Sequence, residues 1–308
     1  MSTKPFDVVT GAFGYTGRYI ARTLLERHRT VRTLTHHPER SSLFGGAVTA
    51  HPLDFERDRL AEALQGADVL YNTYWVRFNR GAVTFDRAVQ QCGALFDAAA
   101  EVGVRRIVHI SVTNADPASL LPYFRGKGQV EAALRACGLP YTILRPALVF
   151  GPEDLLLNNI AWCLRLLPVV GLPGSGDYPI HPVFAGDLGT LAADAGNESG
   201  CSEIDAVGPE VYSYRSLVLQ IAAAAGSHAK VISVPPWLAL AACGLLGMVN
   251  RDVMLTADEM AGLTRGLLVS HDPPRGTTRF SDWVRANGAT LGRSYRSELA
   301  AHYAGPAG

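Results

Sequence analysis

The sequence lacks an excess of charge of either sign. Among its 308 residues, 28 lysines and arginines balance 28 aspartates and glutamates, so the formal net charge is zero at pH 7. Nucleic acids and anionic membranes bind mainly through an excess of positive charge, and the balance therefore argues against nucleic acid as a partner. Internal repeats and low-complexity stretches are also missing, which argues against solenoid architectures.

Cysteine is scarce, and its spacing suits neither a disulfide framework nor a zinc site. The cysteines are odd in number and scattered, without a Cys-x-x-Cys pair: Cys92, Cys137, Cys163, Cys201 and Cys243. Such usage is typical of a reducing compartment. The first five residues lack the apolar core of a signal peptide. We therefore expect a cytoplasmic protein without a bound metal.

A membrane-spanning run is missing as well. The longest apolar stretch, Trp237 to Val249, has thirteen residues, whereas a bilayer requires about 20. It carries no charge, and helices that lie in a membrane interface usually have a polar face rich in lysine and arginine. We expect a buried helix or a lid over an apolar substrate pocket, with peripheral membrane contact as the alternative.

Strand-like runs alternate with helix-like runs through the first half of the sequence. The predicted strands cover Phe6 to Thr10, Val31 to Thr35, Ala47 to His51, Val69 to Thr73, Ile107 to Ser111 and Thr142 to Leu144. The predicted helices cover Tyr15 to Glu26, Arg57 to Leu64, Phe85 to Val102 and Val130 to Ala136. Because right-handed crossovers place a helix between neighbouring parallel strands, this alternation predicts an α/β fold with a doubly wound parallel sheet, of the Rossmann type.

After Pro146, turns rich in glycine and proline alternate mainly with helical patterns. The capping-box pattern from Thr256 to Glu259 predicts the start of a helix, and Ile204 to Val207 looks like one more strand. We therefore predict a Rossmann domain over residues 1–150 and a smaller, mostly helical substrate region over residues 151–308. About residues 183–210 are expected to return to the sheet of the first domain.

A glycine-rich loop, TGAFGYTG from Thr10 to Gly17, follows the first predicted strand and leads into a helix. Glycine permits the tight turn and lets the backbone approach a pyrophosphate, while the helix N-terminus offers free N–H groups to phosphates. The order of strand, loop and helix therefore predicts a dinucleotide site. The predicted contacts are Gly11, Phe13, Gly14, Tyr15, Thr16 and Gly17.

The end of the second predicted strand indicates which dinucleotide is bound. NAD sites usually place an acid about 20 residues beyond the loop to hold the ribose 2′-hydroxyl, and no acid ends this strand. His36 and Arg40 follow it and suit a 2′-phosphate, since arginine pairs well with phosphate. NADP is therefore predicted in preference to NAD. Glu39 either faces solvent or competes with the phosphate.

The loop, the later Leu53-Asp54 and the segment Tyr123-Phe124-Arg125-Gly126-Lys127 together resemble the short-chain dehydrogenase/reductase superfamily. More narrowly, the chain is similar to its atypical and extended branches, the NmrA-like proteins and the group around the NADPH-binding accessory subunit of respiratory complex I. The resemblance covers nearly the whole chain. It implies that Asp54 contacts the adenine and that Asn72 and Thr73 line the cofactor. It also implies that the segment from Leu144 through Pro146 to Pro152 closes over the nicotinamide.

The resemblance further implies a catalytic set of Tyr123, Lys127 and Ser111. On a helix, Tyr123 and Lys127 are four residues apart and share one face. A neighbouring ammonium stabilises a phenolate, so Tyr123 could donate a proton to a carbonyl oxygen while Lys127 holds the ribose hydroxyls. Ser111 would orient the substrate carbonyl, with Thr113 as the substitute. The aromatic residues Tyr74 and Trp75 are expected to pack rather than to bind a substrate.

These features favour NADPH-dependent reduction of a carbonyl group on a small apolar substrate. Only twelve residues separate Ser111 from Tyr123, fewer than in ordinary catalytic members of the family. The short spacing leaves open an NADPH-binding structural or redox-sensing protein without turnover. An epimerase or dehydratase that uses NAD transiently is a third interpretation. The substrate and the oligomeric state do not follow from the sequence.

Overall fold

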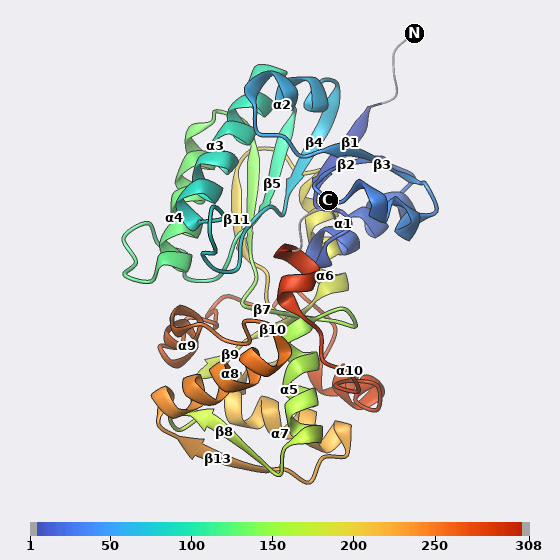
Figure 1. Ribbon diagram of the computed structural model, residues 1–308. Helices are drawn as coiled ribbons and strands as arrows, with labels where there is room; N and C mark the ends of the chain where they lie inside the picture. Colours follow the sequence, from blue (N-terminus) through green and yellow to red (C-terminus); the bar gives the residue numbers. More distant parts are fainter. Residues whose placement is uncertain (1–4, 304–308) are drawn as a thin grey trace. The chain divides into compact units, whose positions relative to one another are not determined.

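The computed structural model describes residues 5–303, and contacts between residues divide the chain into two units. The first unit comprises residues 1–146 and 185–206, and the second comprises residues 147–184 and 207–308. Each is described by itself below, with the elements labelled as in Figure 1.

The first unit is a seven-stranded sheet with the order β11-β6-β5-β4-β1-β2-β3, in which every strand pair is parallel. Its strands are β1 (Phe6–Thr10), β2 (Thr30–Thr35), β3 (Val48–Pro52), β4 (Ala67–Asn72), β5 (Arg106–Ile110), β6 (Tyr141–Arg145) and β11 (Ser202–Asp205). Its helices are α1 (Tyr15–Glu26), η1 (Pro38–Phe44), α2 (Arg57–Leu64), α3 (Phe85–Glu101), α4 (Pro122–Ala136) and α6 (Ala185–Ala195). The predicted doubly wound α/β fold is confirmed.

Helices cover both faces of this sheet. Helices α2, α3 and α4 pack in a row on one face, and α1 packs against α6 on the other (Figure 1). The core beneath α3 and α4 is built from alternating strand residues such as Val8, Leu70 and Ile107 and from the helix residues Phe96 and Val130. Apolar burial of this kind on both faces is what a parallel sheet requires.

Helix α4 begins earlier than the sequence pattern predicted. It starts at Pro122 instead of Val130, with the proline at a first-turn position where its missing N–H costs nothing. The longer helix therefore includes both Tyr123 and Lys127.

The last part of the first unit, residues 185–206, is fixed to the sheet by two neighbouring arginines. Arg106 is fully buried and donates to the carbonyl oxygens of Ala195 and Gly200, at 2.7 Å each. Arg105 donates to the carbonyl oxygen of Gly196 at 2.9 Å. These bonds tie the end of α6 and the loop before β11 to the two arginines at the start of β5.

The second unit has short strand pairs and helices around its own apolar core. Its strands are β7 (Leu148–Phe150), β8 (Val169–Pro173), β9 (Pro179–Ile180), β10 (Pro182–Phe184), β12 (Tyr212–Ser213) and β13 (Lys230–Val234). Its helices are α5 (Leu155–Leu166), α7 (Tyr214–Ala225), α8 (Pro236–Asn250), α9 (Ala257–Thr264), α10 (Phe280–Asn287) and η2 (Leu299–Tyr303). The predicted capping box at Thr256 and Glu259 is present at the start of α9.

The apolar stretch Trp237 to Val249 forms α8, but the expectation that this helix is buried was wrong. Only Ala239 and Gly247 of α8 are buried, whereas the side chains of Trp237, Leu245 and Val249 are 70%, 61% and 81% exposed. Within residues 5–303, no helix is long and apolar enough to cross a membrane.

Candidate functional site

The glycine loop connects β1 to α1 and has the geometry of a phosphate cradle. Gly11 adopts a φ of +68°, which favours glycine, and its carbonyl oxygen accepts from the N–H of Gly14 at 2.8 Å. A Cβ on Gly17 would lie 2.3 Å from the carbonyl oxygen of Gly11, so the helix can approach the loop only without a side chain there. No side chain caps the start of α1 at Gly14. The first-turn N–H groups of α1 can therefore bind a phosphate.

The loop is anchored where the strand order reverses, between β1 and β4. The Thr10 hydroxyl accepts from the backbone N–H groups of Thr73 and Tyr74, at 2.8 and 3.1 Å, and donates to Asn72 Oδ1 at 3.0 Å. The Thr73 hydroxyl in turn donates to the carbonyl oxygen of Thr10. Open α/β sheets bind their ligands at such a switch point, outside the carboxyl ends of the strands.

Two of the predicted cofactor contacts lie beneath the loop instead of at its surface. Asn72 is fully buried, and its amide nitrogen contacts His109 Nδ1 at 3.1 Å and Cys92 Sγ at 3.6 Å. The Phe13 ring is also buried. The polar atoms of the Asn72 side chain are used within the sheet, and the contact of Asn72 with the cofactor stays a prediction. Phe13 can reach a phosphate only through its backbone. Tyr15 and Thr16 are partly exposed.

The residues predicted to bind the 2′-phosphate follow β2, and an acid lies among them. His36 is exposed and Arg40 is partly exposed. Glu39 Oε1 lies 3.0 Å from His37 Nδ1 and 3.8 Å from Arg40 Nε. The Glu39 side chain is 60% exposed to solvent and also lies beside these basic groups, so the structure singles out neither of the two alternatives expected for it.

The other two predicted cofactor residues lie at strand ends of the first unit. Asp54 follows β3, is exposed, and accepts from the N–H of Glu56 at 3.0 Å. Pro146 follows β6, is buried, and its carbonyl oxygen accepts from the N–H of Thr113 at 3.0 Å. Both therefore stand at the carboxyl edge of the sheet, as the glycine loop does.

Lys127 is almost completely buried, with 4% of its surface exposed. Its ammonium donates to the carbonyl oxygen of Ile110, the last residue of β5, at 2.9 Å and lies 4.9 Å from the centre of a Trp75 ring. Burial lowers the pKa of Lys127 to about 8, against smaller opposing effects of Cys92 and Glu131. The geometry thus holds an ammonium of reduced basicity at the carboxyl end of the sheet.

Tyr123 lies one helical turn before Lys127 in an aromatic cluster. Its ring meets the rings of Trp75, Phe85 and Phe124 edge to face, with centroid distances of 6.0, 5.9 and 5.5 Å. Trp75 itself stacks on Phe85, in agreement with the prediction that Trp75 packs against other side chains. A Cβ on Gly126 would lie 2.8 Å from the Trp75 ring, so glycine there lets the indole lie flat against α4.

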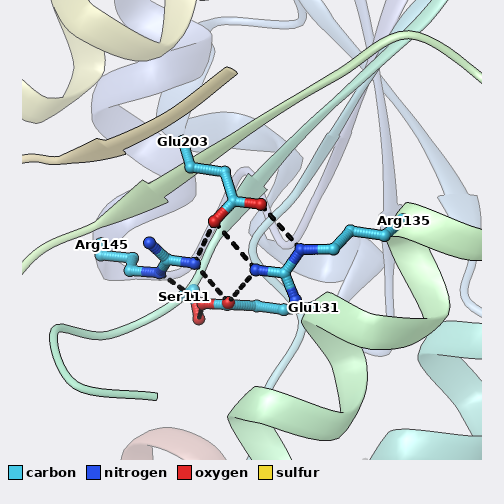
Figure 2. A network of polar contacts seen from close by, with 5 residues as sticks. All are labelled: Ser111, Glu131, Arg135, Arg145 and Glu203. Carbon is cyan, nitrogen blue, oxygen red and sulfur yellow. Dashed lines mark hydrogen bonds and ion pairs between the residues drawn. The ribbon is translucent and has the colours of Figure 1, made fainter. Parts of the chain in front are cut away.

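Ser111 belongs to a polar network with Glu131, two arginines and Glu203 (Figure 2). Its hydroxyl donates to Glu131 Oε1 at 2.6 Å, and both residues are buried. The Glu131 carboxylate also accepts two bonds from Arg145, at 2.8 and 2.6 Å, and one from Arg135 at 3.0 Å. Glu203 on β11 joins the same two arginines, and its hydrogen bonds to Arg135 and Arg145 lower its pKa to about 2.

Glu131 is the main residue that the sequence analysis missed. It follows Lys127 by four residues, as Lys127 follows Tyr123, so the three share one face of α4. That spacing was the available signal. The catalytic roles predicted for Tyr123, Lys127 and Ser111 stay predictions. Among residues 5–303, no three histidine, cysteine, aspartate or glutamate side chains form a group that could hold a metal ion.

Comparison with known proteins agrees with this geometry. Residues 11–153 match the family model described as NAD(P)H-binding. The chain is 26% identical over 260 residues to the 40 kDa subunit of NADH-ubiquinone oxidoreductase from Neurospora crassa, covering 82% of this chain and 68% of that one. It is 24% identical to subunit 9 of the NADH dehydrogenase 1 alpha subcomplex from Arabidopsis thaliana, covering 68% of this chain and 55% of that one.

Solved structures share the fold. The NADPH-dependent quinone oxidoreductase of Escherichia coli, crystallised with NADPH, has a TM-score of 0.75 at 21% identity, covering 91% of this chain and 99% of that one. The triphenylmethane reductase of Citrobacter sp., crystallised with NADP(H), has a TM-score of 0.71 at 19% identity, with the same coverage. Fold, loop and family model together define an NAD(P)H-binding Rossmann protein. Within that class, the family match and the two complex I relatives show a similarity to an atypical family of the short-chain dehydrogenase/reductase type. The nicotinamide dinucleotide predicted as cofactor is confirmed.

Proposed function

We propose that the protein is an NADPH-dependent oxidoreductase that reduces a carbonyl group on a small apolar substrate. The observation that carries this proposal is the placement of Tyr123 and the buried Lys127 on one face of α4, at the carboxyl edge of the sheet that also bears the glycine loop. Two reductases with the same fold were crystallised with NADPH or NADP(H), which supports the same cofactor here.

The residues of the first unit fit this cofactor. A side chain at Gly17 would fill the cradle, and α1 begins without a side-chain cap, so the loop can bind the diphosphate. Arg40 would pair with the 2′-phosphate, and Lys127 would hold the ribose hydroxyls. Reduced nicotinamide supplies a hydride when bound. Tyr123 would donate its phenolic proton to the substrate oxygen, and the ammonium of Lys127 would stabilise the resulting phenolate.

The test compares the wild-type protein with Tyr123→Phe. NADPH binding, followed by the fluorescence of the reduced nicotinamide, should change less than about twofold, because the phenyl ring keeps its aromatic contacts. Carbonyl-dependent oxidation of NADPH should fall by roughly 10² to 10⁴, since proton transfer contributes about that factor. Wild-type turnover in the phenylalanine variant would refute the role of Tyr123.

A protein that binds NADPH without turnover is the second candidate. The contacts of the partly buried Tyr123 ring with Trp75, Phe85 and Phe124 favour it, because they restrict the approach of a substrate to this side chain. Relatives of this chain are named as subunits of a larger NADH dehydrogenase, which also supports it. Tight NADPH binding with no oxidation by quinones, aldehydes or ketones would establish this alternative.

The cytoplasmic location and the small-molecule partner expected from the sequence belong to the same proposal. All five cysteines are free thiols, which supports a reducing compartment.

A further inference from the structure

The hydrogen bond from Ser111 to Glu131 limits what Ser111 can do in the proposed reaction. A serine hydroxyl has one proton to donate. That proton points to Glu131 Oε1 across 2.6 Å, in an environment where Ser111 is 4% exposed. A hydroxyl that orients a substrate carbonyl would have to donate the same proton to the carbonyl oxygen.

Glu131 cannot exchange roles with Ser111 in this contact. Two guanidinium groups bind its carboxylate through three hydrogen bonds of 2.6 to 3.0 Å, and its side chain is 2% exposed. A carboxylate bound by two guanidinium groups in this way accepts hydrogen bonds and does not donate one to Ser111. If Ser111 turned its proton to a substrate, Glu131 Oε1 would keep the bond from Arg145 Nε and lose a charge-assisted hydrogen bond, which is unfavourable for a buried carboxylate.

We propose that Glu131 is a positioning residue that holds the Ser111 proton away from the substrate, so that Tyr123 supplies the proton and the site favours conjugated carbonyls of the quinone type. This inference rests on the proposed function and adds to it a division of labour and a substrate class.

The substrate class follows from the basicity of the oxygen that hydride transfer creates. An isolated ketone that accepted hydride at its carbonyl carbon would form a C–H bond there, break the carbonyl π bond and become an alkoxide, about as basic as hydroxide, whose conjugate acid in bulk water has a pKa of about 15.7. A quinone that accepted hydride at the conjugated ring carbon would form the C–H bond there and shift its π electrons onto the carbonyl oxygen, and tautomerisation would then give a hydroquinone with phenolic oxygens comparable to that of tyrosine, whose pKa is about 10. In either case the oxygen would take the Tyr123 proton, which water then replaces. Because Ser111 donates no hydrogen bond to the product oxygen in this arrangement, the site stabilises the weakly basic oxygen of a quinone product more easily than the strongly basic oxygen of an alkoxide.

The hydrogen bond between Glu131 and Ser111 is tested without any turnover, by double-mutant cycles in which the thermal unfolding midpoint of each variant is measured. In the cycle of Ser111→Ala with Glu131→Gln, the change in midpoint of the double variant should differ from the sum of the changes in the two single variants. The matched cycle of Ser111→Ala with Glu203→Gln should be additive within about 2 °C, because Glu203 binds the same arginines without a hydrogen bond to Ser111. Additivity in both cycles would overturn the proposal. If Ser111→Ala fails to fold, Ser111→Cys replaces it.

The consequence for the reaction is tested by turnover. Ser111→Ala should lower kcat/KM less than about threefold, against a loss of 10² or more in Tyr123→Phe, and a benzoquinone should be reduced with a higher kcat/KM than cyclohexanone. A loss of 10² in Ser111→Ala with unchanged NADPH affinity, or a preference for the ketone, would overturn the inference. Wild-type protein that binds NADPH but reduces neither substrate would refute the proposed function and the substrate class, and the cycles would still decide the role of Glu131.

Discussion

At the end of β2, the Glu39 carboxylate lies beside the residues expected to bind a 2′-phosphate. It contacts His37 Nδ1 at 3.0 Å and lies 3.8 Å from Arg40 Nε. A phosphate bound here would be attracted by Arg40 and repelled by Glu39. The preference for NADPH over NADH therefore depends on the difference between two neighbouring charges.

Two substitutions separate these charges. Arg40→Ala should weaken NADPH binding about tenfold or more and change NADH binding little, because only NADPH carries the 2′-phosphate. Glu39→Gln should tighten NADPH binding severalfold, since it removes the repulsion and keeps the side-chain size. Dissociation constants of NADPH and NADH for the wild type and both variants, measured at one ionic strength, test these two expectations. Equal losses for NADPH and NADH in Arg40→Ala would place the 2′-phosphate elsewhere.

Lys127 makes the stability of the protein depend on pH. Burial lowers its pKa from 10.5 to about 8, so the folded chain releases the proton at lower pH than the unfolded chain. The buried ammonium destabilises the fold below pH 8, and this cost disappears as the pH rises from 8 to about 10.5, because the unfolded state then binds more protons. The full effect is on the order of 3 kcal/mol.

The comparison that isolates this effect is Lys127→Met, which keeps the length of the side chain and removes the charge. The free energy of unfolding of the wild type should rise between pH 8 and 10.5 relative to that of the methionine variant. Denaturation by urea at several pH values measures both. Parallel curves for the two proteins would show that Lys127 has an ordinary basicity in the fold.

At this scale, a short motif was recognisable in the sequence and contacts between distant segments were not. Tyr123 and Lys127 were identified from the resemblance of residues 123–127 to a known family, whereas the predicted helix began only at Val130. The meaning of Glu131 depends on Ser111 after β5, Arg145 on β6 and Glu203 on β11, which only the folded sheet brings together.

Among the elements, α8 shows most clearly that composition does not determine burial. Its fifteen residues carry no charge, which indicated a buried helix, yet most of its large side chains are exposed. An apolar helix without a polar face has no amphipathic pattern to show which side faces the core. The sequence predicted the helix and could not predict its orientation.

Two glycines of α8 test that orientation. Gly244 is exposed, and a Cβ there would meet nothing within 4 Å. Gly244→Ala should therefore raise the free energy of unfolding by roughly 0.5 to 1 kcal/mol, because alanine favours the helix. Gly247 is buried, and a Cβ there would lie 2.6 Å from the carbonyl oxygen of Asp252. Gly247→Ala should lower the free energy of unfolding by roughly 1 to 3 kcal/mol. If chemical denaturation showed Gly247→Ala to be more stable than Gly244→Ala, the orientation of α8 given by the structure would be wrong.

In the whole molecule, the first unit is assembled from two separate segments of the chain. Residues 1–146 supply six of its seven strands, and residues 185–206 supply β11 and α6 after the chain has passed through the second unit. Strand alternation in the first half predicted the parallel sheet. The strand-like run from Ile204 to Val207 led to the prediction that about residues 183–210 return to this sheet. The close packing of α6 on α1 did not follow from the sequence: a Cβ on Gly189 would lie 2.8 Å from the backbone of Tyr19.

The late segment should therefore be required for the first unit to fold. Residues 1–146 alone lose the α6 side of α1, the β11 edge beside β6 and the carbonyl acceptors that Arg105 and Arg106 use. Arg106 would keep Tyr141 and Thr142 as acceptors but lose the carbonyl oxygens of Ala195 and Gly200, and a buried arginine that loses part of its acceptors is destabilising. We expect this fragment to show no cooperative thermal transition and no NADPH binding. A chain in which a flexible linker joins residues 1–146 directly to 185–206 should regain both, measured by circular dichroism and nicotinamide fluorescence. Cooperative unfolding of residues 1–146 alone would show that the early strands already form a complete folding unit.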